Sequence, residues 1–86
     1  MKKLQNNLYI NTQGAYLHKE RETLVVEINR QKAAQLPIHG IGGIFCFGNV
    51  LVSPQVMGFC GEHGVHMALF TEYGRFLARI QGDRKS

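Results

Sequence analysis

The segment from residue 43 to residue 70 constrains the fold more than any other feature of this sequence. Gly43–Phe47 and residues 65–70 are apolar runs rich in branched and aromatic residues, which predict two β-strands. Between them, Ser53 and Pro54 are typical of a helix start, and Gly64 is placed to end that helix. Roughly 20 residues separate the strand centres, enough for a crossover between parallel strands. We expect the first of these strands to be buried on both faces.

The predicted helix carries a glycine at every third residue, namely Gly58, Gly61 and Gly64. A glycine inside a helix costs about 1 kcal/mol relative to alanine, so a helix this short needs tertiary contacts. The favoured explanation is a close approach of this bare helix face to the sheet. The alternative is a face that admits a phosphate group or the backbone of a partner.

The flanking sequence predicts short strands and no second helix. Leu24, Val26 and Ile28 alternate with other positions along residues 23–29, which places these three on the core face. Val25 is therefore expected to point outward. The other predicted strands span residues 8–10, 15–18, 33–36 and Phe76–Ile80, with turns at 11–14, 19–22, 30–32 and 72–75. Residues 1–36 then form an antiparallel meander, and Pro37 ends its last strand or places it at an edge.

The predicted fold class is mostly β (α+β), with short antiparallel strands and a single short helix in a strand–helix–strand crossover. With 86 residues the chain has room for one small domain. We expect residues 1–80 to form that domain and residues 81–86 to be a polar tail. No apolar run approaches the roughly 18 residues of a membrane span, and residues 1–7 lack the apolar core of a signal peptide.

The two cysteines and the charged residues indicate where the protein works. Cys46 and Cys60 are isolated within apolar runs, which is typical of buried thiols in a reducing compartment, so the expected location is the cytoplasm. The formal net charge is +4, with lysines and arginines mostly at turns and chain ends. This pattern is compatible with a weak phosphate-binding surface or with ordinary solubilising charge.

No short motif predicts catalysis. The glycines at residues 40–43 precede a strand, whereas a dinucleotide-binding loop needs them between a strand and a helix. The one metal-like set lacks the closely paired ligands of structural zinc sites; it consists of Cys46, Cys60, His63 and His66. The carboxylates lie at turns, at a helix end or on an outward strand face. From its residues alone the chain is a poor candidate for an enzyme.

Over nearly its whole length, however, the sequence resembles a known family. The segments that carry the resemblance are LY followed by TQGAYL, then ETLVVEI, LPIHGIGGIFCFG, a V-S-P helix start and EHGVHMALFTEYGRFLARI. Together they resemble the N-terminal β domain of the CRISPR-associated spacer integrase, the metal-dependent endonuclease of CRISPR adaptation, most closely that of type I systems of the C subtype. Order and spacing agree from Leu8 to Ile80.

The resemblance implies that the nuclease and integrase chemistry lies elsewhere. In the family, a glutamate, a histidine and an aspartate bind the divalent metal, Mg or Mn, in a helical domain that follows the β domain. No residue here matches them, and Glu62, His63, His66 and Asp83 are not assigned that role. The chain stops at Ser86, where a linker to that domain is expected. The fragment is therefore expected to need no cofactor and to be inactive alone.

The resemblance also implies two binding roles. The family's β domain forms a homodimer and helps to seat the ends of the protospacer duplex. Its wider partners are the CRISPR repeat and a second small adaptation protein, with no membrane involved. The expected DNA contacts are Gln13, Gly14, Tyr16 and Arg75, although the alternation around Tyr16 also fits a core position. The expected dimer contacts are Val65, Met67, Leu69, Phe76 and Leu77.

Two other functions are compatible with the residues. A stand-alone basic β module would bind nucleic acid with an affinity that falls steeply as salt increases. A small zinc-stabilised interaction domain would use the cysteines and histidines named above.

Overall fold

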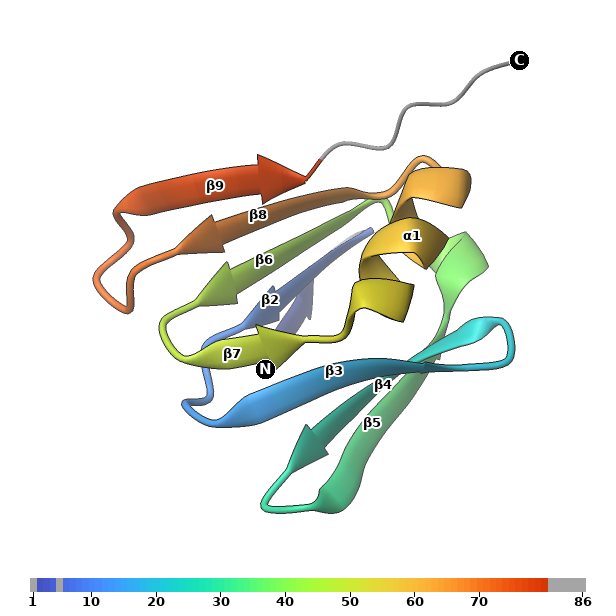
Figure 1. The fold of residues 1–86 in the computed structure, drawn as a ribbon, viewed down its shortest axis with the longest axis horizontal. Coiled ribbons are helices and arrows are strands. Elements are labelled where there is room, and N and C mark those ends of the chain that lie inside the picture. Colours follow the sequence, from blue (N-terminus) through green and yellow to red (C-terminus); the bar gives the residue numbers. More distant parts are fainter. Residues whose placement is uncertain (1, 5, 81–86) are drawn as a thin grey trace.

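The structure is a computed structural model that describes residues 2–4 and 6–80, and the predicted tail at 81–86 lies outside the described residues. Its elements are β1 (Lys2–Leu4), β2 (Asn7–Ile10), β3 (Ala15–Glu20), β4 (Thr23–Ile28), β5 (Gln31–Pro37), η1 (Ile38–Gly40), β6 (Gly43–Phe47), β7 (Val50–Val52), α1 (Pro54–Glu62), β8 (His66–Phe70) and β9 (Phe76–Ile80). The strands form a five-stranded sheet, β1–β2–β6–β8–β9, and a four-stranded sheet, β5–β4–β3–β7 (Figure 1). The fold is mostly β with one short α-helix, as predicted.

The predicted strand–helix–strand crossover is confirmed. β6 and β8 are parallel neighbours, and their register begins with Gly43 opposite His66. The Ser53 side chain accepts a hydrogen bond from the backbone N–H of Val56 at 3.3 Å, which caps the start of α1. Gly64 adopts a left-handed conformation with φ +69° just after the helix. The sequence signals at both ends of the helix therefore act as expected.

The predicted antiparallel meander is wrong at its first connection. β2 does not pair with β3; it lies parallel to β6 in the five-stranded sheet, and β3 lies parallel to β7 in the four-stranded sheet. Residues 11–14 therefore carry the chain from one sheet to the other instead of closing a hairpin. Alternation in a short strand shows which residues are buried, but it does not identify the strand's partner.

The β4–β5 turn is placed one residue earlier than predicted. Asn29 and Arg30 have φ values of 55° and 63°, and Ile28 pairs with Gln31. Two consecutive left-handed residues make the tight turn whose twist matches an antiparallel hairpin. Asn29 is therefore a turn residue, and Gln31 already belongs to β5.

The core lies between the two sheets and is closed at one end by α1 (Figure 1). The inward faces of the strands and one side of α1 supply its fully buried members, which include Leu8, Ile10, Leu17, Leu24, Val26, Ile44, Val56, Cys60 and Met67. β6 is not buried on both faces as predicted, since Phe45 and Phe47 on its outer face are only partly buried. Val25 lies on the outer face of β4, as expected, since its partners in the register are His18 and Gln35. It is nevertheless fully buried.

The glycine face of α1 does not approach a sheet at Gly58. A Cβ atom built on Gly58 would meet nothing within 4 Å, and Gly58 is exposed. The helix packs instead through Val56, Phe59 and Cys60, which are buried. The expectation of close backbone contact at Gly58 is therefore wrong. Within the described residues, no helix combines the length and apolar character needed to cross a bilayer.

Candidate nucleic-acid interface and dimer surface

The residues considered as metal ligands do not form a site. Burial raises the pKa of the Cys46 thiol to about 12, and the neighbouring Cys60 contributes. Burial likewise raises the pKa of Cys60 to about 11. Both thiols therefore stay protonated at neutral pH, whereas zinc binds thiolates. Among residues 2–4 and 6–80, no three His, Cys, Asp or Glu side chains are grouped so that they could hold a metal ion.

The thiols and histidines also do not fit Mg or Mn. These cations prefer oxygen ligands, chiefly carboxylates, whereas Cys46 and Cys60 offer sulfur inside an apolar core. His66 is exposed. The His63 ring meets the ring of Phe59 edge-on, with centroids 4.8 Å apart. These four side chains therefore do not provide the oxygen ligands that Mg or Mn prefers.

Three connections gather at the end of the molecule opposite α1 (Figure 1). They are residues 11–14, residues 47–49 and residues 71–75, which we call the loop end. Backbone hydrogen bonds join them: the N–H of Gly14 donates to the carbonyl of Asn49 at 2.7 Å, and the N–H of Gly48 donates to the carbonyl of Phe70 at 2.9 Å. The loop end therefore combines segments from both sheets.

Gln13 is the hub of the loop end. Its Nε2 donates to the carbonyl oxygens of Phe47, at 3.0 Å, and Asn11, at 3.3 Å. Its Oε1 accepts from the backbone N–H of Asn49 at 2.7 Å. Gly48 has φ +84°, a conformation that favours glycine, and a Cβ atom there would meet this amide. Gln13 thus has a structural role that the sequence did not reveal, and its contact with DNA stays a prediction.

Two further predicted DNA contacts, Gly14 and Tyr16, follow Gln13 in the sequence. Gly14 has φ +84°, and a Cβ there would meet nothing within 4 Å, so its backbone faces open space. Tyr16 is 38% exposed, because its neighbours Ala15 and Leu17 fill the core side of β3. The core interpretation of Tyr16 is therefore wrong. Its ring stacks on His18 with centroids 5.4 Å apart.

Arg75 lies in the β8–β9 turn, and its side chain is exposed. Tyr73 lies in the same turn and is 91% exposed, and it was not among the predicted site residues. The signal available in the sequence was an aromatic residue among the polar and glycine residues of a turn. The loop end contains one arginine, Arg75, and one glutamate, Glu72, so its formal charge is close to zero.

The predicted dimer residues divide into two groups. Val65 and Met67 are buried in the core of this chain, and Leu69 packs partly against it, so these side chains face inward. Phe76 and Leu77 are 56% and 59% exposed. They belong to β9, an edge strand of the five-stranded sheet. A surface for a second copy is therefore available at β9, but not at Val65 or Met67.

Aromatic rings extend from β9 across the outer face of the five-stranded sheet. Phe76 meets Phe70 edge-on at 5.8 Å between centroids, and Phe70 stacks on Phe47 at 4.8 Å. Phe70 also lies 6.4 Å from Phe45, which stacks on Tyr9 at 5.1 Å. We call these five rings the aromatic row. It forms a continuous apolar strip with its most exposed member at β9.

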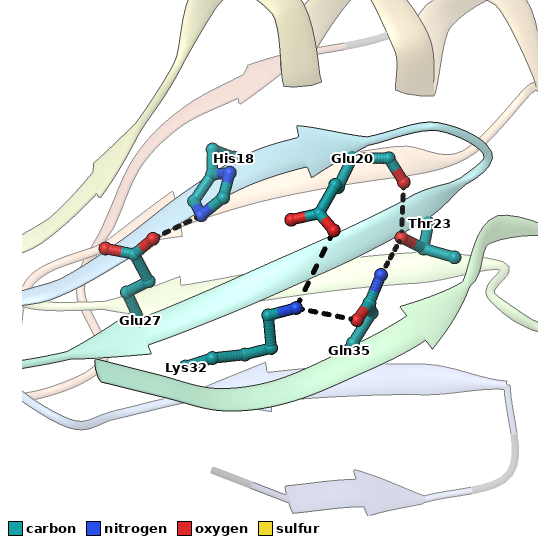
Figure 2. A network of polar contacts seen from close by, with 6 residues as sticks. All are labelled: His18, Glu20, Thr23, Glu27, Lys32 and Gln35. Atoms are coloured by element: carbon teal, nitrogen blue, oxygen red, sulfur yellow. Dashed lines mark hydrogen bonds and ion pairs between the residues drawn. The ribbon is translucent and has the colours of Figure 1, made fainter. Parts of the chain in front are cut away.

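The outer face of the four-stranded sheet carries a polar network instead (Figure 2). Its members are His18, Glu20, Thr23, Glu27, Lys32 and Gln35. Lys32 Nζ donates to Gln35 Oε1 at 3.0 Å, and Gln35 Nε2 donates to the Thr23 hydroxyl at 2.9 Å. His18 and Glu27 form a separate hydrogen bond, which is an ion pair when His18 is protonated. Val25 lies between His18 and Gln35 in the strand register, which accounts for its burial.

A shallow hollow lies between α1 and the β3–β4 hairpin. It is lined by Lys19, Glu22, Gln55, Gly58, Phe59 and Glu62. Lys19 Nζ lies 4.8 Å from the centroid of the Phe59 ring. The Lys19 ammonium group therefore makes a cation–π contact with Phe59. The two carboxylates at the rim oppose a phosphate group. This hollow therefore does not favour the phosphate-binding alternative for the helix glycines.

The fold of this chain recurs in solved structures of CRISPR proteins. A CAS1 protein from Thermotoga maritima covers 100% of the chain with a TM-score of 0.80 and 15% identity, over 26% of its own length. A TtCas1–DNA complex also covers 100%, with a TM-score of 0.77 and 22% identity, over 33% of that protein. At these identities the likeness establishes the fold: the chain has the architecture of a Cas1 β domain.

Sequence comparison identifies the family. The family model for CRISPR associated protein Cas1 matches residues 8–86, so the chain belongs to this family. It is 45% identical over 85 residues to CRISPR-associated endonuclease Cas1 1 of Chlorobaculum tepidum, and 42% identical over 82 residues to CRISPR-associated endonuclease Cas1 2 of Rhodospirillum rubrum. It spans about a quarter of the length of each relative, 25% and 24% respectively. The resemblance found in the sequence is confirmed.

Proposed function

We propose that this chain is the dimerisation and DNA-seating domain of a CRISPR-associated integrase that inserts new spacers into the CRISPR array. The whole protein acts in the cytoplasm as a DNA endonuclease and integrase that depends on Mg or Mn. Its partners are a second copy, the protospacer duplex, the CRISPR repeat and a second small adaptation protein. The residues described above bind and position, and the phosphoryl-transfer chemistry belongs to the part of the protein outside this chain.

The observation that carries this proposal is the exposed apolar edge at β9. An edge strand with unpaired backbone groups and exposed apolar side chains is suited to pairing with another chain. Phe76 and Leu77 supply those side chains, and the aromatic row extends the apolar surface beyond them. A homodimer with two-fold symmetry would bring β9 of each copy against the same surface of the other.

DNA seating is supported by the composition of the loop end and by its relatives. The loop end offers an exposed arginine and an exposed tyrosine on a frame tied together by Gln13. Similar folds occur in a Cas1–DNA complex and in a Cas6-RT-Cas1–Cas2 complex. The second of these supports a small adaptation protein among the partners.

Light scattering of the chain across a dilution series tests dimerisation. We expect the mass of a dimer at high concentration, and we expect the double variant Phe76→Ser with Leu77→Ser to be monomeric at every concentration. Leu51→Ser is the matched control, because Leu51 is 61% exposed on the other sheet. A monomeric wild-type chain, or a dimer that the double variant does not weaken, would contradict the proposal. DNA seating is tested separately by titrating the chain against a short duplex in increasing salt.

A further inference from the structure

We infer that Gln13 is a positioning residue, whose amide fixes the loop end in the arrangement that receives DNA and does not itself bind the phosphate backbone. This inference rests on the proposed seating of DNA and names the side chain that holds the loop end in its conformation. It gives an indirect role to a residue that was predicted to contact DNA.

The first argument is the hydrogen-bonding capacity of the Gln13 amide. A glutamine amide has two N–H donors on Nε2, and here Nε2 donates to the carbonyls of Phe47 at 3.0 Å and Asn11 at 3.3 Å. Oε1 accepts from the N–H of Asn49 at 2.7 Å. Phosphate oxygens are acceptors, so a phosphate contact would need one of these donors and would break an existing bond. The side chain is exposed, yet its donors are used within the protein.

The second argument is the place of the amide between two connections that cross from one sheet to the other. Residues 11–14 lead from β2 to β3, and residues 47–49 lead from β6 to β7 (Figure 1). Because β2 is parallel to β6 and β3 is parallel to β7, the two connections run side by side in the same direction. The N–H of Gly14 bonds the carbonyl of Asn49, and the Gln13 amide adds further bonds between the connections. The relative position of the two sheets at the loop end therefore depends on this side chain.

The third argument is that the turn held by Gln13 also supports the β8–β9 hairpin. A Cβ atom on Gly48 would meet the Gln13 amide, so the amide lies directly against the backbone of this turn. The N–H of Gly48 donates to the carbonyl of Phe70 at 2.9 Å, where β8 ends and the hairpin turn begins. A shift of residues 47–49 would therefore displace the hairpin that carries the exposed Arg75. Gln13 thus acts on the cation of the loop end through its neighbours.

The location of Gln13 separates this role from a general contribution to stability. The core lies between the two sheets, whereas Gln13 is exposed and does not belong to it. Hydrogen bonds at an exposed site contribute little to the free energy of unfolding, since water replaces them. We therefore expect a Gln13 variant to keep its fold and to lose the arrangement of the loop end.

The test compares Gln13→Met, which keeps the side-chain length and removes the amide, with the matched control Gln55→Met on α1, at the opposite end of the molecule (Figure 1). Hydrogen exchange is measured at individual backbone N–H groups, and binding of a labelled short DNA duplex is measured by fluorescence anisotropy in low salt. For Gln13→Met we expect faster exchange at Gly14 and Gly48, whose N–H groups bond to backbone carbonyls and not to Gln13. We also expect its DNA affinity to fall by about tenfold. Gln55→Met should match the wild-type chain in both measurements.

Thermal unfolding of each variant checks the fold, and we expect Tm values within a few degrees of the wild type. If Gln13→Met does not fold, Gln13→Asn replaces it in both measurements. Asparagine keeps an amide, but its side chain is one methylene shorter and cannot reach both Phe47 and Asn49. It should therefore show the same two effects.

The outcomes separate this inference from the proposed function. Faster exchange at Gly14 and Gly48 with unchanged DNA affinity would make Gln13 structural only and would overturn the inference. Weaker DNA binding with unchanged exchange at these two residues would make Gln13 a direct DNA contact, which overturns the inference while DNA seating stands. No change in either measurement overturns it as well. If the wild-type chain does not bind the duplex in low salt, DNA seating by this domain is overturned together with this role of Gln13.

Discussion

The outer face of the five-stranded sheet is covered by aromatic rings, whereas the outer face of the four-stranded sheet is covered by polar side chains that bond to one another. On the four-stranded sheet, Lys32, Gln35 and Thr23 are linked by hydrogen bonds, and Val25 is buried beneath the polar layer. On the five-stranded sheet, Phe70 touches three other rings, and the row ends at the exposed Phe76. The polar outer face of the four-stranded sheet is suited to contact with water. The aromatic outer face of the five-stranded sheet leaves apolar surface that a partner can cover.

The largest expected effect comes from breaking the aromatic row. Phe70→Ala removes the ring that contacts Phe45, Phe47 and Phe76. We expect it to lower the free energy of unfolding by about 3 kcal/mol, at the lower end for aromatic truncation because Phe70 is only partly buried. Urea denaturation measures the change. Gln35→Ala, on the outer face of the four-stranded sheet, is the control. Equal losses of unfolding free energy for the two variants would contradict the distinction between the two outer faces.

An intermediate effect is expected from the residue under the polar network. Val25→Ala removes two methyl groups from a fully buried position, and it should cost about 2 kcal/mol. The same denaturation experiment measures this value. The cross-strand neighbours of Val25 are the polar residues His18 and Gln35, so the cost reports how well these side chains cover it. A cost near zero would show that the network does not cover this side chain.

The smallest effect is expected from the network itself. Glu27→Gln removes the charge that faces His18, while the two side chains are 32% and 23% exposed. Solvent screening limits such a pair, so we expect a loss of about 0.5 kcal/mol that shrinks as salt is added. Comparing Tm at low and high ionic strength measures it. A loss that stays the same as salt is added would contradict an electrostatic origin for the effect of Glu27→Gln.

The local structure could be predicted from the sequence where a residue type has one physical explanation. Ser53 and Pro54 predicted the start of α1, Gly64 its end, and the apolar runs predicted the parallel strands on either side. The family resemblance placed the chain correctly among Cas1 proteins. The helix-end and strand signals depend on local chemistry, so they do not require knowledge of the remaining fold.

The rest depended on tertiary neighbours. The burial of Val25 follows from the side chains that lie over it, and no alternation pattern encodes them. The parallel partner of β2 lies in β6, and the short strand gave no sign of it. The structural role of Gln13 depends on Phe47 and Asn49, which its amide reaches only in the folded chain. The exposure of Tyr73 could not be predicted either, because an aromatic side chain in a turn can pack back on the strands or point into solvent, and the fold decides between them.

The amide of Gln13 also has a consequence for how the chain folds. It joins Gln13 to Phe47 and Asn49, which lie 34 and 36 positions further along the chain. The parallel pairings of β2 with β6 and of β3 with β7 span similar distances in sequence. The hairpins β3–β4 and β4–β5 can form from local contacts, whereas β2 has no parallel partner until β6 has been synthesised. Contacts of such long range slow folding. We therefore expect the loop end to form only after β6 and β7 have been synthesised.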